Sequence, residues 1–140
     1  MKKIGQFEDM EVWVLARKLA NQIYDVSEKG AFARDFWLRD QMRRAAVSIL
    51  SNIAEGYESD SDRQFIRYLG FAKASAGELR AQLYIALDRK YLSQQEFSGM
   101  KDLTRSCSRQ LAGLVRYLSN NPLSRRVREE TFYYDILEEF

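Results

Sequence analysis

Apolar residues recur along this chain at alternating steps of three and four, the spacing that places side chains along one face of an α-helix. The longest run covers residues 65–86 and keeps this spacing for three heptads. It consists of Phe65, Leu69, Ala72, Ala76, Leu79, Leu83 and Ala86. Shorter stripes of the same kind predict helices over residues 9–27, 35–55 and 93–119. No segment shows the strict alternation of a β-strand, so the pattern predicts an all-α fold.

The predicted helices begin and end at residues that favour helix termini. Ser61 precedes Gln64 by three residues, and Ser93 precedes Glu96 in the same way, which is the capping-box spacing. Gly56 is placed to end the second helix. Since short connections join the long helices, we expect an antiparallel up-down-up-down four-helix bundle over residues 1–122.

Composition removes several classes of chemistry. The chain has 140 residues, no histidine and a single cysteine, Cys107. The missing histidine excludes Ser-His-Asp and Cys-His catalysis and histidine-ligated metals. The single cysteine excludes a disulfide within the chain and CxxC zinc sites. Carboxylate, lysine and tyrosine side chains remain, yet we expect no enzyme, no metal site and no cofactor.

The sequence also indicates a location. No run approaches the ~18 consecutive apolar residues of a membrane span, and no apolar segment follows the basic N-terminus as in a signal peptide. A single reduced cysteine suits the cytoplasm. We therefore expect a cytoplasmic protein that does not contact a membrane.

Charge is distributed unevenly along the chain. Residues 1–128 carry 22 basic and 15 acidic side chains, whereas residues 129–140 carry five acidic and no basic ones. The fourth predicted helix has a basic stripe within an arc of about 80°, away from its apolar face. This stripe consists of Lys101, Arg105, Arg109 and Arg116. It is either an ordinary solvated face, although such faces usually mix signs, or a surface that binds nucleic acid.

The second predicted helix carries a polar stripe beside its apolar face, again within an arc of about 80°. It consists of Gln41, Arg44, Ser48, Asn52 and Glu55. Such side chains bond a neighbouring helix or a second subunit, with Arg44 paired to Glu55 or another carboxylate. Ligand contact and catalysis are the alternatives, but Ser48 has no base on this helix.

Aromatic residues make up 13% of the chain, more than one small bundle core easily holds. Phe71 and Ile85 fall on the side of the third predicted helix opposite its heptad stripe. Exposed pairs of this kind more often mark a protein interface than a surface for stacking bases. We therefore place an oligomer interface at Phe71 and Ile85.

Residues 123–140 form a separate acidic and aromatic tail. Tyr133, Ile136, Leu137 and Phe140 would share one face of a short helix. Either the tail is a frayed terminus, or this face docks on the bundle, a neighbouring subunit or a partner.

Three motifs over about residues 5–120 resemble one bacterial family. They are Phe7-x-x-Met10-x-Val12-Trp13-x-x-Ala16, Gln41-x-x-Arg44-Ala45-x-x-Ser48-Ile49-x-x-Asn52-Ile53-Ala54-Glu55-Gly56 and Phe65-x-x-Tyr68-Leu69-x-x-Ala72-x-Ala74-Ser75-x-Gly77-Glu78-Leu79. Together they are similar to the 23S rRNA intervening-sequence proteins. Leu50 stands where that family often has proline, so we expect the second helix to lack a kink.

The resemblance implies an antiparallel four-helix bundle, a ring-like homopentamer and no established enzymatic activity. Family members are encoded within intervening sequences of rRNA genes and elsewhere in bacterial genomes. Relatives that assist the reverse transcriptases of diversity-generating retroelements bind nucleic acid through a basic surface.

Residues and resemblance together predict a non-enzymatic bacterial homo-oligomer, pentameric by resemblance, that binds RNA or DNA with sequence tolerance. The alternative is a protein-binding scaffold or an accessory subunit for a polymerase or reverse transcriptase. In that alternative the tail is the contact element.

Overall fold

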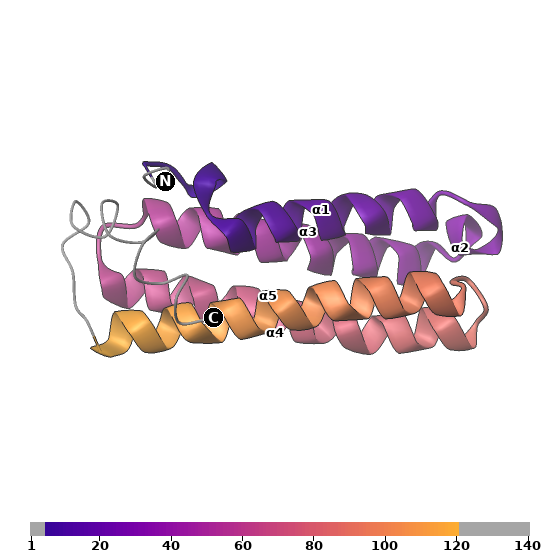
Figure 1. The fold of residues 1–140 in the computed structure, drawn as a ribbon. Coiled ribbons are helices and arrows are strands. Elements are labelled where there is room, and N and C mark those ends of the chain that lie inside the picture. Colours follow the sequence, from indigo (N-terminus) through magenta and orange to yellow (C-terminus); the bar gives the residue numbers. More distant parts are fainter. Residues whose placement is uncertain (1–4, 121–140) are drawn as a thin grey trace.

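The computed structural model describes residues 5–120, which form four long helices and two short ones (Figure 1). In chain order they are η1 (Phe7–Asp9), α1 (Glu11–Ser27), α2 (Gly30–Arg34), α3 (Phe36–Glu58), α4 (Asp62–Asp88) and α5 (Gln94–Asn120). Residues 5–120 contain no strand, which confirms the prediction of an all-α fold and a helical bundle. The predicted tail, residues 123–140, lies outside the described residues.

The long helices lie side by side in two layers, with α1 and α3 in one layer and α4 and α5 in the other (Figure 1). Within this arrangement α3 packs against α1 and α4, and α5 packs against α4 and α1. The connections from α1 to α3 and from α4 to α5 lie at one end, and the connection from α3 to α4 lies at the other (Figure 1). Each long helix therefore has one outward side.

The apolar stripes predicted from spacing form the core. Every residue of the α4 stripe, from Phe65 to Ala86, is 0% exposed. The stripes of α1, α3 and α5 are likewise buried and belong to the same cluster. Because each stripe covers one face only, no helix within residues 5–120 is long and apolar enough to cross a bilayer.

The caps of α4 and α5 form at the predicted serines. The Ser61 hydroxyl accepts a hydrogen bond from the N–H of Gln64 at 3.2 Å. At Ser93 both halves of the capping box form, because the Glu96 N–H donates to the hydroxyl at 3.0 Å and the Ser93 N–H donates to the Glu96 carboxylate at 2.9 Å. Both helices accordingly begin one residue after their caps.

The spacing of apolar residues did not predict α2, because five residues are too short to show a helical period. Its buried residue is Phe32, whose ring stacks on Tyr91 with 5.0 Å between ring centres. The Tyr91 hydroxyl donates a hydrogen bond to the Asp35 carboxylate at 2.9 Å. Asp35 also caps α3 by accepting from the Leu38 N–H at 3.2 Å. Contacts with a residue far along the chain thus hold the turn between α1 and α3.

Gly56 does not end α3, which continues to Glu58, so that part of the prediction was wrong. A Cβ atom at Gly56 would lie 2.9 Å from the Phe65 ring and 2.9 Å from the Tyr68 Cβ. Glycine is needed here because α3 and the start of α4 approach each other closely, and not because the chain turns.

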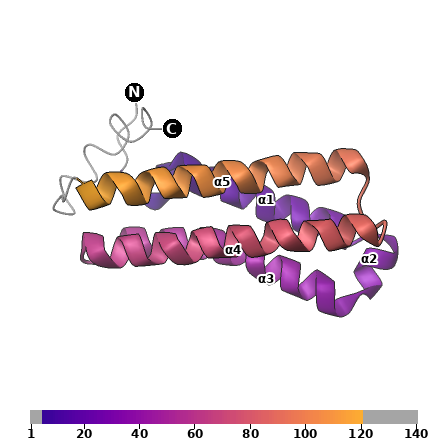
Figure 2. The same ribbon diagram turned by 90° about the horizontal axis from the view of Figure 1, so that it is seen from below.

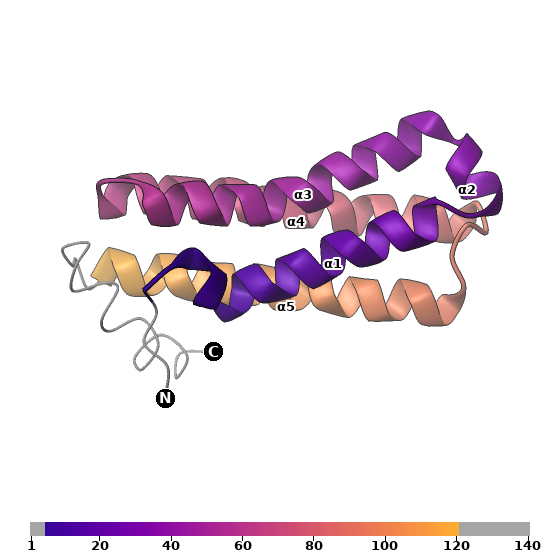
Figure 3. The ribbon, with the colours of Figure 1, turned by 90° about the horizontal axis from the view of Figure 1, so that it is seen from above.

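The α3 helix bends near its middle, and its N-terminal half turns away from α4 and follows α1 (Figures 2 and 3). The bend occurs without a proline, because residue 50 is leucine, so the expectation that this helix lacks a kink was wrong.

Cys107 lies in the core on α5 as a free thiol, 0% exposed. Burial raises the pKa of this thiol to about 11, because an apolar surrounding penalises the thiolate. The side chain therefore packs as a small apolar group and not as a nucleophile.

Replacing Gly56 with alanine is expected to lower the free energy of unfolding by about 1–3 kcal/mol, because the new methyl group overpacks the α3–α4 contact. Urea unfolding followed by circular dichroism measures this change. The matched control is Gly99→Ala in α5, where an added Cβ meets no atom within 4 Å. That substitution is expected to raise stability by about 0.5–1 kcal/mol. A higher free energy of unfolding for Gly56→Ala would contradict the close approach of α3 and α4 at this residue.

Cys107 is expected to resist a thiol-specific reagent such as DTNB at mildly alkaline pH in the folded protein, and to react fully in guanidinium chloride. The reason is that its pKa is raised from 9.0 to about 11, so the neutral thiol persists. The same shift contributes stability that is lost as the pH rises from about 9 through 11. Rapid modification of the folded protein would show that α5 opens readily.

Candidate nucleic-acid and subunit interfaces

The basic stripe of α5 lies on the surface beside α4. Arg105, Arg109 and Arg116 are exposed, and none forms a hydrogen bond or ion pair with another described residue. The ammonium group of Lys101 lies 5.4 Å from the centre of the Phe97 ring and 5.9 Å from that of Tyr84. Since Tyr84 belongs to α4, this contact places the stripe at the boundary between the two helices.

Two cations of α4 extend the stripe. Lys73 and Arg80 precede Tyr84 by eleven and four residues, so they share the side of α4 that Tyr84 turns towards α5. The two helices run in opposite directions side by side (Figure 2). Tyr84 on α4 lies level with Lys101 on α5, and moving along the bundle lowers the residue number on α4 while it raises the number on α5. Arg80, four residues before Tyr84, therefore lies level with Arg105, four residues after Lys101. By the same count, Lys73 lies at a height along the bundle between Arg109 and Arg116.

We call this surface the basic face. It consists of Lys73, Arg80, Lys101, Arg105, Arg109 and Arg116, and it extends for about 22 Å along α5 at 1.5 Å per residue. None of the six has an ion pair within residues 5–120. Of the acidic side chains on the two helices, Glu78 is bonded to α3 and Asp102 lies beside the stripe. Asp88 follows Tyr84 by four residues, so it lies at the Lys101 end of the face. Unpartnered cations in a row attract a polyanion.

The polar stripe of α3 lies on the opposite side of α4 and joins these two helices. The Arg44 guanidinium donates hydrogen bonds to the Gln41 side chain at 3.2 Å and to the Glu78 carboxylate of α4. The Gln82 amide donates to the same Glu78 oxygen at 3.3 Å. The partner of Arg44 is therefore Glu78 and not Glu55, and the bond lies within one chain.

The remaining stripe residues are not gathered into a reactive group. The Asn52 amide donates to the Ser48 carbonyl oxygen at 2.8 Å. Within the described part of the chain, neither the Ser48 hydroxyl nor the Glu55 carboxylate forms a side-chain hydrogen bond, and Glu55 is exposed. The stripe supplies helix-to-helix bonds, with no base beside the serine.

Phe71 and Ile85 are 46% and 51% exposed on α4, as expected for an outward-facing pair. Beside them runs a row of exposed small residues with steps of four, three and four: Gly70, Ala74, Gly77 and Ala81. A Cβ added at Gly70 or Gly77 would meet no atom within 4 Å. This surface, which we call the α4 outer face, lies opposite the buried heptad stripe and leaves room for another helix to approach.

A further exposed pair lies at the start of α3. Phe36 is 62% and Trp37 72% exposed, the largest values among the described large apolar residues. The Arg39 guanidinium lies 4.8 Å from the centre of the Phe36 ring. Both aromatic residues lie outside the apolar stripe of this helix. Their spacing alone did not predict a functional site.

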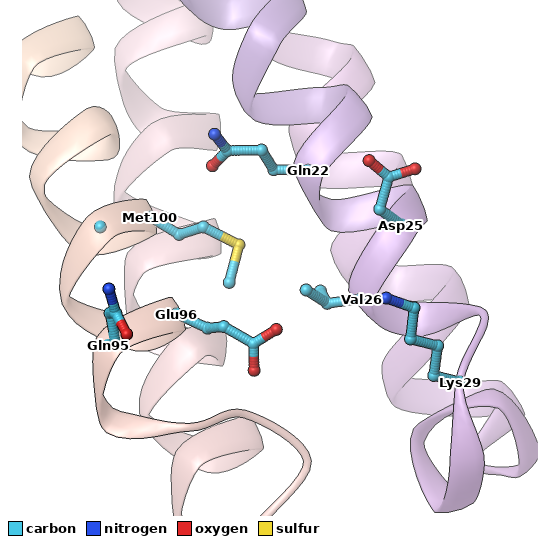
Figure 4. Close-up of a pocket in the computed structure, with 8 residues that line it drawn as sticks. Gln22, Asp25, Val26, Lys29, Gln95, Glu96 and Met100 are labelled. Atoms are coloured by element: carbon cyan, nitrogen blue, oxygen red, sulfur yellow. The ribbon is translucent and has the colours of Figure 1, made fainter.

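A cleft of about 360 Å³ separates the end of α1 from the start of α5. Figure 4 shows Met100 and Glu96 extending from α5 towards Val26 and Gln22 of α1. The Glu96 carboxylate is already bonded to the N–H of Ser93. None of the residues predicted for a site lines this cleft.

The chain matches the protein family described as "23S rRNA-intervening sequence protein" over residues 8–113. Among solved structures it is similar to a protein of unknown function from the S23 ribosomal protein family of Bacteroides thetaiotaomicron. That pair is 20% identical with a TM-score of 0.69, covering 75% of this chain and 98% of the other, so the likeness concerns the fold alone. No curated protein matches the chain. Since the family match spans most of the bundle, this protein belongs to the 23S rRNA-intervening sequence protein family.

Proposed function

We propose that this protein is a non-enzymatic, cytoplasmic nucleic-acid-binding protein that works as a ring-like homo-oligomer. In the proposal an antiparallel up-down-up-down four-helix bundle presents its basic face to the phosphates of RNA or DNA. The number of copies, five, comes from the family resemblance. No metal or cofactor takes part.

The basic face is the observation that carries this proposal. Four of its six cations are arginines, whose planar guanidinium groups match phosphate oxygens in pairs. Their side chains lack partners among residues 5–120, so contact with phosphate breaks no bond described within the chain. Phosphate contact carries no information about base identity, which supports sequence tolerance.

A ring explains how a chain with a net charge of only +2 binds a polyanion. Each copy repeats one basic face, and a single long strand that contacts several copies gains avidity without any new contact. The α4 outer face supports association, because small residues beside two exposed apolar side chains let a neighbouring helix pack closely.

A protein-binding scaffold is the second candidate. Exposed Phe36 and Trp37 favour it, because large exposed aromatics mark contact surfaces for other proteins. In that case the ring docks a polymerase or reverse transcriptase through the end of the bundle that carries α2.

Reversing charge on the basic face is expected to weaken binding to a long single-stranded RNA at least about tenfold at low salt. The two test variants are Arg105→Glu with Arg109→Glu, and Lys73→Glu with Arg80→Glu. Fluorescence anisotropy measures the affinity, and the two variants should be similarly weakened because both pairs lie on one surface. In the parent protein, log affinity should fall with log salt with a slope of about −4 for six phosphate contacts.

The matched control is Arg17→Glu with Lys18→Glu on exposed positions of α1, which changes net charge by the same amount. It is expected to retain much more affinity than either basic-face variant. Equal losses in all three variants would attribute binding to net charge alone. Parental affinity in the α4 variant would remove Lys73 and Arg80 from the interface.

Replacing Phe71 with aspartate is expected to dissociate the oligomer, because a charge on the α4 outer face blocks apolar packing between copies. Light scattering coupled to gel filtration measures the mass. Val14→Asp on α1 is the control, since Val14 is 50% exposed and lies on a different helix. If Phe71→Asp and Val14→Asp both keep the mass of the parent oligomer, the interface lies elsewhere.

A further inference from the structure

The end of the chain carries a charge opposite to that of the basic face. Residues 129–140 contain five acidic side chains and no basic one. These are Glu129, Glu130, Asp135, Glu138 and Glu139. They lie outside the described residues, but the helix from which they continue, α5, is the helix that carries most of the basic face.

We propose that the acidic segment 129–140 docks on the basic face of its own chain and competes there with nucleic acid. The occupant of this surface in the free protein is thus a part of the same molecule. The competition rests on the proposed function, whereas the docking itself is a property of the chain alone.

The length of the chain permits this contact. Arg116, the nearest cation of the basic face, lies about 6 Å from the end of α5 at Asn120, and Lys101 lies about 29 Å away. The connecting residues 121–128 span up to about 26 Å when extended, and the acidic segment about 40 Å more. Every cation of the face is therefore within reach of the acidic side chains.

The chemistry of the two surfaces is complementary beyond charge. Tyr84 is 47% exposed at the far end of the basic face, beside Lys101, so an apolar contact point accompanies the cations. The acidic segment contributes apolar residues among its carboxylates, namely Phe132, Tyr133, Tyr134, Ile136, Leu137 and Phe140. An acidic and aromatic segment matches a surface of arginines, lysines and an exposed ring.

Several other cations of the bundle are less suited to this segment because neighbouring residues already engage them. Arg44 is bonded to Glu78, and Arg39 is bonded to Asp40 at 2.9 Å. The Arg43 guanidinium lies 4.5 Å from the centre of the Tyr24 ring and donates a hydrogen bond to the Ser27 hydroxyl at 2.8 Å. The basic face gathers six cations without such a partner ion in the described part of the chain. Four of them belong to α5, the helix from which the chain continues through residues 121–128 to the acidic segment.

The first test neutralises the tail in the full-length protein, with Glu129→Gln, Glu130→Gln, Asp135→Asn, Glu138→Gln and Glu139→Gln. We expect affinity for a fluorescein-labelled single-stranded RNA to rise about tenfold or more at low salt, because the competing anion is lost. The matched control neutralises five exposed acids on or near α1 and at the α3–α4 turn: Glu8→Gln, Glu11→Gln, Asp25→Asn, Glu28→Gln and Asp60→Asn. It changes net charge equally, so an equal rise in both variants overturns the proposal.

The second test measures docking without nucleic acid. Spin labels at Gln94→Cys on α5 and Tyr134→Cys in the tail report their separation by pulsed EPR, and neither substitution changes the charge. Cys107 stays unlabelled because it is buried with a pKa raised to about 11. The labelled chain is diluted into unlabelled protein, so that distances within one chain dominate. We expect a short, narrow distance distribution that becomes long and broad with Arg105→Glu and Arg109→Glu.

The outcomes separate docking from function. A broad distribution that these two substitutions leave unchanged overturns docking, whether or not RNA binds. A short distance that disappears on dilution shows that the tail docks on a neighbouring copy, which also overturns the proposal as stated. A short distance released by charge reversal supports docking. If the parent protein and the tail-neutralised variant both fail to bind RNA, the proposed function is removed while docking stands.

Discussion

The buried heptad stripe of α4 is the constraint on which the other surfaces depend. All seven of its residues are 0% exposed, and α4 lies between α3 and α5 in the bundle. Once that stripe faces the core, the rest of the helix surface is divided in a fixed way. Lys73 and Arg80 share the side of α4 that Tyr84 turns towards α5, and Glu78 and Gln82 lie on the side towards α3. The small residues beside Phe71 and Ile85 face outward. The burial of one apolar stripe therefore sets the positions of the basic face, of the polar contacts with α3 and of the α4 outer face.

The two sides of α4 differ in how their charges are satisfied. Towards α3, Glu78 accepts bonds from Arg44 and Gln82, so charge there is neutralised within the chain. Towards α5, six cations stand without partner ions in residues 5–120. Like charges in a row repel each other, and that repulsion is relieved when an anion binds. The formal net charge of +2 conceals this contrast, because acidic residues at the chain end offset cations that the bundle concentrates on one face.

The proposed ring and the proposed tail contact have opposite effects on the affinity of the basic face for nucleic acid. Repetition around a ring multiplies the basic face for a long polyanion. An acidic segment tethered to each copy competes at high local concentration, since the tether confines it near its target. A strand that spans several copies displaces such segments more effectively than a short one, because each added contact strengthens the same bound strand.

The sequence by itself determined the four long helices and their inward faces. Spacing of three and four depends on geometry within one helix, so the buried stripes, the caps at Ser61 and Ser93 and the basic stripe of α5 could all be predicted. Only the tertiary structure decided what each helix meets. Three contacts each depend on the register between two helices: the bond of Arg44 to Glu78, the approach of Gly56 to Phe65, and the contact of Lys101 with Tyr84 that sets Lys73 and Arg80 beside the α5 stripe. That register is set by how whole side-chain surfaces pack, and no local pattern in the chain records it.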